Sequence, residues 1–174
     1  MAKALTIIDV QKGMFAYGDP HHGEAVVDRL AQLLDAARAS GAPIFFVQHD
    51  GGEGSPLAPN SEGFDFHAAL APNPDEDVTL KRHCSVFQAT DLEQKLRERG
   101  VDGLVIGGMQ TEFCIDTAVR GAFERGFAVT LIADGHTTFD TPALRAEQII
   151  AHHNHTLASG HFASVQNSAQ IAFE

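Results

Sequence analysis

The chain has 174 residues, of which 44% are hydrophobic and 20% are charged. This is the size and composition of one globular domain, so a single domain is predicted over residues 1–174. The formal net charge of −11 disfavours binding to the phosphates of nucleic acids. No apolar run is long enough to span a bilayer, and MAKALTIID does not read as a signal peptide. The expected location is the cytoplasm, and the expected partner is a small molecule, not nucleic acid or a membrane.

In the first half of the chain, apolar runs of strand length alternate with segments of helical period, which is typical of an α/β protein with a parallel sheet. The predicted elements are a strand at 5–9, a helix at 24–40 that stops before Gly41, a strand at 43–48 and a short strand at 78–80. Residues 49–73 are rich in Gly, Pro, Ser and Asn. They are predicted to form a long irregular loop that walls a binding pocket.

The second half continues the same alternation. The predicted elements are a helix at 91–99, a buried strand at 104–106, a helix from near Thr111 to Gly126, a strand at 127–133 and a strand at 161–165. Between the last two strands, Thr141 and Pro142 are expected to open a long helix, with threonine as the cap and proline at the first helical position.

Three chemically useful residues come at or just after predicted strand ends. Asp9 ends the run LTII, Lys81 follows VTL, and Cys114 comes after VIGG, in the first turn of a predicted helix. Ligands of parallel α/β sheets bind at the carboxyl ends of the strands. Free N–H groups and the helix dipole are expected to favour a Cys114 thiolate over the thiol. An acid, a cation and a nucleophile are what amide cleavage through a thioester requires.

Each of these residues also has a purely structural interpretation. A cysteine after an apolar strand is often packed in the core, an aspartate at a strand end often caps a turn, and Lys81 beside Arg82 is compatible with a solvated edge. Cys84 lies in a segment without an oxyanion scaffold and is interpreted as structural. In a chain with two cysteines and no secretion signal, free thiols are favoured over a disulfide.

Three segments, in this order, resemble the isochorismatase-like cysteine hydrolases, a family that includes nicotinamidases and several amidohydrolases of small amides. The segments are IIDVQKGMF, LKRHCSVFQATDLEQKL and VIGGMQTEFCIDTAVRGAFERGFAVTLIADG, and the match covers nearly the whole chain. The resemblance implies a Rossmann-like three-layer α/β/α sandwich with a six-stranded parallel sheet. It also implies that Asp9, Lys81 and Cys114 form a catalytic triad.

The resemblance further implies a reaction and its supporting parts. A cis peptide before Gln110 is expected to direct the backbone N–H groups of Gln110 and Cys114 into one oxyanion hole. The expected chemistry is hydrolysis of a small amide, lactam or related C–N bond through an acyl-cysteine. Thr111 is expected to cap the helix of the nucleophile. Because relatives often self-associate, a homo-oligomer is expected.

The segment after the second strand departs from the nicotinamidase pattern. Nicotinamidases typically carry an Asp-x-His motif there, which builds a metal site, whereas this chain reads QHDGG at residues 48–52. This wording is closer to the metal-free amidohydrolase branch, so no metal and no cofactor are expected. His152, His153 and His155 have no acidic or cysteine ligand nearby in the sequence and are expected at the surface or an interface.

The predicted pocket walls come from several segments of the chain. They are Met14, Phe15, His49, Phe64, Phe113 and Phe139. Two other functions stay open at this point. One is vinyl-ether hydrolysis of the isochorismatase type. The other is a non-catalytic, receiver-like binding module, although such modules need paired acids at the first strand and IIDV supplies one.

Overall fold

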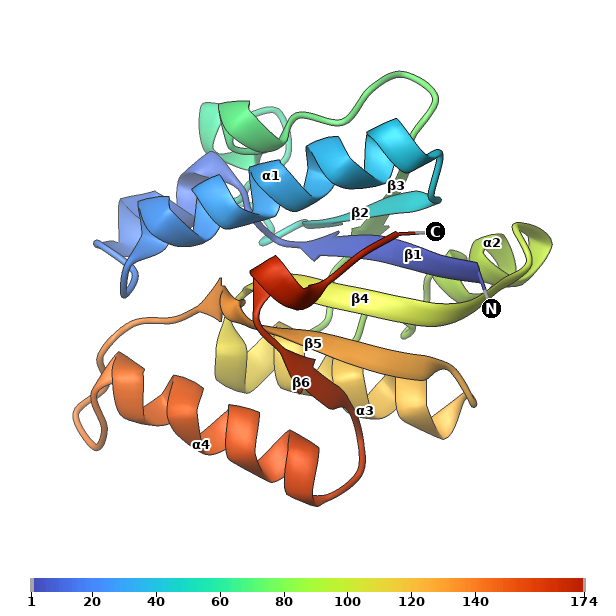
Figure 1. Cartoon of the computed structure of the whole chain (residues 1–174). Helices are drawn as coiled ribbons and strands as arrows, with labels where there is room; N and C mark the ends of the chain where they lie inside the picture. Colours follow the sequence, from blue (N-terminus) through green and yellow to red (C-terminus); the bar gives the residue numbers. More distant parts are fainter. Residues whose placement is uncertain (1, 174) are drawn as a thin grey trace.

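The computed structural model describes residues 2–173, and these form one sheet of six parallel strands in the order β3-β2-β1-β4-β5-β6 (Figure 1). The strands are β1 (Ala2–Ile8), β2 (Ile44–His49), β3 (Asp77–Lys81), β4 (Val101–Met109), β5 (Ala128–Thr137) and β6 (Ser164–Gln166). The α/β fold with a six-stranded parallel sheet is therefore confirmed.

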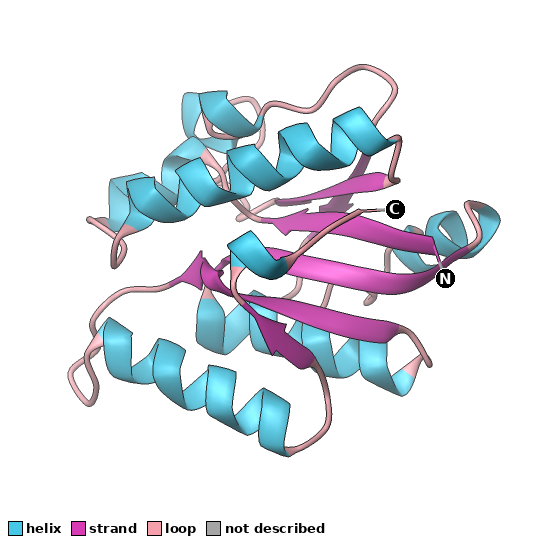
Figure 2. Cartoon of the chain, in the orientation of Figure 1, coloured by secondary structure: helices cyan, strands magenta, loops and turns pink. Residues whose placement is uncertain are grey.

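Helices cover both faces of the sheet (Figure 2). One face is covered by α1 (Gly23–Ser40), and the C-terminal segment packs against the same core. The other face is covered by α2 (Leu92–Glu98), α3 (Asp116–Glu124) and α4 (Ala146–Ser159). No helix within residues 2–173 combines the length and the apolar character needed to cross a membrane.

The strand β1 shows why the sheet needs cover on both sides. Its residues Ala4 and Ile8 belong to one buried apolar cluster, and Leu5 and Ile7 belong to the cluster on the opposite face. Successive side chains of a strand point to opposite faces, so an apolar run such as ALTII is buried only when helices pack on both. This is the physical reason for the three layers.

The order of the strands creates a crevice at their carboxyl ends. The chain runs from β1 outward to β2 and β3, and then returns to place β4 on the other side of β1. Such a reversal of strand order is the usual position of a ligand site in an open α/β sheet. Three shorter helices lie in the connections that follow β1 and β2: η1 (Lys12–Tyr17), η2 (Glu62–Phe64) and η3 (Ala68–Leu70).

The beginning of the last helix differs from the prediction. Thr141 and Pro142 do not open it, because α4 begins at Ala146. The hydroxyl oxygen of Thr141 instead accepts from the N–H of Leu144 and closes a turn, and Asp140 Oδ1 accepts from the N–H of Ala146. The threonine therefore caps a turn that precedes the helix, and the helix begins four residues later than predicted.

Gly108 brings β4 into close contact with β1. Its φ is 130°, and a Cβ at this position would lie 2.0 Å from the carbonyl oxygen of Ile8. Because this neighbour is backbone, no side chain can move to relieve the clash. Gly108→Ala is therefore expected to lower the free energy of unfolding by about 3 kcal/mol or more, measured by urea denaturation.

Gly41→Ala is the matched control for this change. Gly41 also has a positive φ, of 72°, but nothing lies within 4 Å of the place where its Cβ would be. The cost there is expected to be about 1 kcal/mol, which is the conformational penalty alone. Equal losses in the two variants would contradict the close approach of β4 to β1.

Candidate active site

The side chains of Asp9, Lys81 and Cys114 meet at the carboxyl edge of the sheet. Lys81 Nζ lies 2.6 Å from Asp9 Oδ2 and 3.2 Å from Cys114 Sγ. All three residues are buried, with exposed fractions of 2% for Asp9, 1% for Lys81 and 9% for Cys114. The structure therefore brings together the three residues that the sequence singled out.

Each of the three is positioned by a different element. Asp9 follows β1 directly with a φ of 54°, a left-handed conformation that aspartate adopts more readily than most residues, and its N–H donates to Val47 of β2. Lys81 is the last residue of β3 and is paired in register with His49, the last residue of β2. Cys114 lies in a short π-helix, η4 (Thr111–Ile115), between β4 and α3.

His49 completes the surroundings of the ammonium group. Its Nδ1 lies 3.1 Å from Lys81 Nζ. Because an ammonium group can only donate, Nδ1 is the acceptor and Nε2 carries the proton. Burial, together with the charge of Lys81, lowers the pKa of His49 below its ordinary value. The imidazole is therefore neutral at neutral pH and lies beside a permanent cation.

Burial and the neighbouring charges act in opposite directions on the pKa values of Asp9 and Lys81. Burial raises the pKa of the Asp9 carboxyl, and the neighbouring Lys81 opposes this without cancelling it. Burial alone would lower the pKa of Lys81, but the charges of Asp9 and Cys114 outweigh it, and the pKa of Lys81 is raised. The carboxylate is thus a stronger base than an exposed aspartate, and the lysine stays protonated.

The expected thiolate at Cys114 is wrong for the free protein. Burial and the nearby Asp9 carboxylate raise the pKa of the Cys114 thiol well above its ordinary value, although Lys81 acts in the opposite direction. Cys114 does lie in the first turn of a helix, as predicted, because η4 runs directly into α3, but burial is the largest influence on its pKa. Sγ therefore keeps its proton at rest, and a base is needed to remove it.

The start of η4 is fixed by a buried hydrogen-bonded chain that the sequence did not reveal. Thr111 does not cap the helix, since Gln110 occupies the N-cap position without a side-chain bond. Instead, Thr111 Oγ1 lies 2.8 Å from His136 Nδ1, His136 Nε2 lies 2.9 Å from Asn154 Oδ1, and Asn154 Nδ2 donates to Ala133. Asn154 therefore accepts from His136, and His136 accepts from the Thr111 hydroxyl.

Burial lowers the pKa of His136 to about 4, so the ring is neutral and its single N–H is committed to Asn154. One signal in the sequence could have revealed this residue. A buried histidine in a strand needs a polar partner, and Thr111 is a polar residue that follows the neighbouring strand β4 by two residues.

The backbone around the nucleophile contains the two N–H groups that were predicted to form the oxyanion hole. The peptide bond between Met109 and Gln110 is cis. Within residues 2–173, neither the N–H of Gln110 nor that of Cys114 donates to a backbone acceptor in another element. Both residues line the cavity, so a role for their N–H groups in an oxyanion hole stays a prediction.

A cavity of about 370 Å³ opens onto the sulfur. It is lined by Asp9, Met14, Tyr17, His49, Leu57, Cys84, Gln110, Phe113, Cys114 and Phe139. Met14, His49, Phe113 and Phe139 were predicted as walls. Tyr17 and Leu57 were missed, because nothing in their local sequence distinguishes them from other loop residues.

Three predictions about the cavity are wrong. Phe15 packs on His67 instead and lines a separate hollow. Phe64 is not part of the lining, and what anchors its segment is its carbonyl oxygen, which accepts from the side-chain amides of Gln11 and Gln48. Cys84, interpreted as structural, is exposed and lines the cavity that contains Cys114.

The histidines considered in the sequence analysis do not form a metal site among the described residues. Within residues 2–173, no group of three or more His, Cys, Asp or Glu side chains is arranged to hold a metal ion. At the end of β2, His49 faces Lys81, and the next residue, Asp50, is paired with Arg82 at 2.7 Å. On α4, His152 and His155 are exposed, as expected for surface residues.

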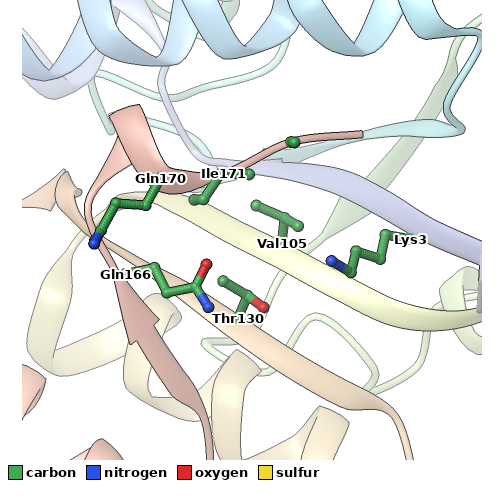
Figure 3. A pocket seen from close by; sticks show the side chains of 7 residues that line it. Lys3, Val105, Thr130, Gln166, Gln170 and Ile171 are labelled. Carbon is green, nitrogen blue, oxygen red and sulfur yellow. The ribbon is translucent and has the colours of Figure 1, made fainter. Parts of the chain in front are cut away.

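A second cavity, of about 310 Å³, lies on the sheet face under the C-terminal segment (Figure 3). The figure shows Lys3, Val105 and Thr130 on the strands and Gln170 on the segment above them. Its lining contains no thiol, carboxylate or imidazole, so it offers no base or nucleophile of the kind found at the carboxyl edge. The candidate active site is therefore the cavity at Cys114.

Comparison with known proteins identifies the family. The isochorismatase domain family matches residues 3–165 of the chain. The chain belongs to the isochorismatase family. An uncharacterized family member from Bacillus subtilis, YddQ, is 37% identical over 142 residues, which cover 79% of each chain. Membership in this family of hydrolases favours an enzyme over a receiver-like binding module.

Other isochorismatase-family relatives have named activities. A streptothricin hydrolase from Streptomyces noursei is 37% identical over 143 residues, covering 81% of this chain and 51% of that protein. A ureidoacrylate amidohydrolase from Methylobacterium radiotolerans is 29% identical, covering 75% and 65%. The crystal structure of a cysteine hydrolase from Pseudomonas syringae superposes with a TM-score of 0.90 at 26% identity, covering 97% and 90%. The chain spans only about half to two thirds of the two enzymes named by substrate.

The Thr111 hydroxyl is expected to position η4 through His136. Thr111→Val keeps the shape but leaves His136 Nδ1 buried without a donor, so the free energy of unfolding is expected to fall by about 1–3 kcal/mol in urea denaturation. For any substrate that is turned over, kcat is expected to fall with little change in KM. Thr111→Ser is expected to restore both the free energy of unfolding and kcat. Equal behaviour of the Val and Ser variants would show that the hydroxyl does not matter.

The two thiols are expected to react at different rates with iodoacetamide at neutral pH. Cys84 is exposed, whereas Cys114 is buried and protonated at rest, so Cys84 is expected to be alkylated first. Peptide mass spectrometry over a time course measures both rates, and Cys84→Ser reports Cys114 without competition. Faster alkylation of Cys114 than of Cys84 would mean that a thiolate exists in the free protein.

Proposed function

We propose that the protein is a cysteine-dependent hydrolase of a small amide, lactam or related C–N bond, which acts through an acyl-cysteine. The observation that carries this proposal is the buried contact of one ammonium group, Lys81 Nζ, with both the Asp9 carboxylate and the Cys114 sulfur. Support also comes from relatives whose names are amidohydrolase and cysteine hydrolase.

The first half of the reaction uses Asp9 as a base. As Cys114 Sγ attacks the carbonyl carbon, the thiol proton passes to Asp9, whose raised pKa suits it to accept it. The carbonyl oxygen becomes an oxyanion, and the N–H groups of Gln110 and Cys114 donate to it. When the C–N bond breaks, Asp9 returns the proton to the leaving nitrogen, and the acyl group stays on sulfur as a thioester.

The second half uses the same groups on water. Asp9, again ionised, takes a proton from a water molecule that attacks the thioester carbon, and the same two N–H groups stabilise the oxyanion. The C–S bond then breaks, the carboxylic acid leaves, and sulfur takes back the proton. Lys81 stays protonated throughout and stabilises the negative charge that alternates between Asp9 and Cys114.

Hydrolysis of a panel of small amides, followed by ammonia or amine release, tests this function. Cys114→Ala removes the nucleophile and is expected to lower kcat by about 10⁴-fold or more. Asp9→Asn removes the base and is expected to lower kcat by about 10²–10⁴-fold. Asp102→Asn is the matched control: it makes the same change at an exposed position near the amino end of β4 and is expected to retain activity.

The pH dependence of activity tests the role of Asp9 as the base. Asp9 accepts a proton only when it is ionised, and burial raises its pKa above the ordinary value of 3.8. As the pH is lowered, activity is therefore expected to be lost at a higher pH than it would be with an exposed aspartate as the base. Release that is equally fast in Cys114→Ala and the unmodified protein would show that the sulfur is not the nucleophile.

A further inference from the structure

The walls of the cavity at Cys114 are apolar above a polar floor. Met14 and Leu57 are buried, whereas Tyr17 and Phe113 are 55% and 50% exposed. These side chains surround the space into which the group attached to the scissile carbonyl must extend. Such a lining binds hydrocarbon and aromatic groups by removing their surface from water.

The one cation at the floor is fully engaged. Lys81 has three N–H donors, and three acceptors lie within hydrogen-bond distance: Asp9 Oδ2 at 2.6 Å, His49 Nδ1 at 3.1 Å and Cys114 Sγ at 3.2 Å. Lys81 itself is 1% exposed. A carboxylate on a substrate would therefore find no free donor on this ammonium group, and it would meet the negative charge of Asp9.

Neighbouring cations are also paired with acids of their own. Lys12 Nζ lies 3.2 Å from Asp65 Oδ2, and Arg82 Nε lies 2.7 Å from Asp50 Oδ2. Neither side chain belongs to the cavity lining. The whole chain carries a net charge of −11, so its field repels anions as well.

The floor also presents the second oxygen of Asp9. Asp9 Oδ1 is buried and has no partner within residues 2–173 other than the neighbouring Cys114 thiol, whereas Oδ2 is held by Lys81. A ligand N–H can donate to the same oxygen. Primary and secondary amides bring such an N–H next to the carbonyl that Cys114 attacks.

We propose that this cavity selects uncharged amides with an apolar acyl group and excludes those that carry a carboxylate. The inference rests on the proposed amide hydrolysis for its chemistry, but the exclusion of anions follows from the lining itself. It separates this chain from any family member whose substrate is an acid.

Hexanamide and adipic acid monoamide differ only in the end of the chain, a methyl group against a carboxylate. The ratio of their kcat/KM values, measured by ammonia release, is expected to favour hexanamide by about a hundredfold or more. Phe113→Arg places a cation at the rim and is expected to reduce that ratio at least about tenfold. Phe123→Arg is the matched control, at a position on α3 that is 44% exposed and outside the lining, and is expected to leave the ratio unchanged.

Equal turnover of the two amides would overturn the proposed selection while leaving amide hydrolysis intact. Alkylation by two reagents of similar size and different charge tests the selection without any turnover. The rates at which iodoacetamide and iodoacetate modify Cys114, each divided by the rate of that reagent with glutathione, are expected to favour iodoacetamide by about tenfold or more. Equal normalised rates would show that anions enter freely. If iodoacetamide is favoured but no amide is hydrolysed, the proposed function fails and the exclusion of anions stands.

Discussion

The site depends on one buried ammonium group. Burying an unpaired lysine is costly, and Lys81 is tolerated in the core because its three hydrogens reach acceptors from three segments: Asp9 after β1, His49 at the end of β2 and Cys114 in η4. These segments are far apart in the sequence and meet where the strand order reverses. The cation thus contacts residues from β2 and from η4, which lie on opposite sides of β1 in the sheet. These contacts hold the base and the nucleophile next to each other.

Burial sets the protonation of this floor as much as charge does. It raises the pKa values of both Asp9 and Cys114, and the ammonium group of Lys81 opposes both shifts. Cys114 lies in the first turn of the helix formed by η4 and α3, yet burial is the largest influence on its thiol and raises the pKa. The thiol therefore depends on proton transfer to Asp9 during attack, and a fixed geometry between the two atoms matters more than a low thiol pKa.

The floor and the walls of the cavity have different origins. The floor is built from residues at or just after strand ends, which the packed sheet holds in place. The walls come from connecting segments: Met14 and Tyr17 from η1, Leu57 from the loop after β2 and Phe139 from the segment after β5. Loops tolerate change better than strands, so a common floor can serve different substrates. This accords with relatives that are named for substrates as different as streptothricin and ureidoacrylate.

The sequence by itself determined the α/β class, because apolar runs alternate with helical periods, and it located Asp9, Lys81 and Cys114, because polar residues at strand ends are conspicuous and resemble a known pattern. It could not decide which loop side chains face the cavity: Phe15 and Phe64 are outside it, while Tyr17, Leu57 and Cys84 line it. Nor did it show that Thr111 bonds to His136, 25 residues further on, or that the sulfur is protonated. These properties depend on distance and burial between segments remote in sequence, which exist only once the tertiary structure has formed.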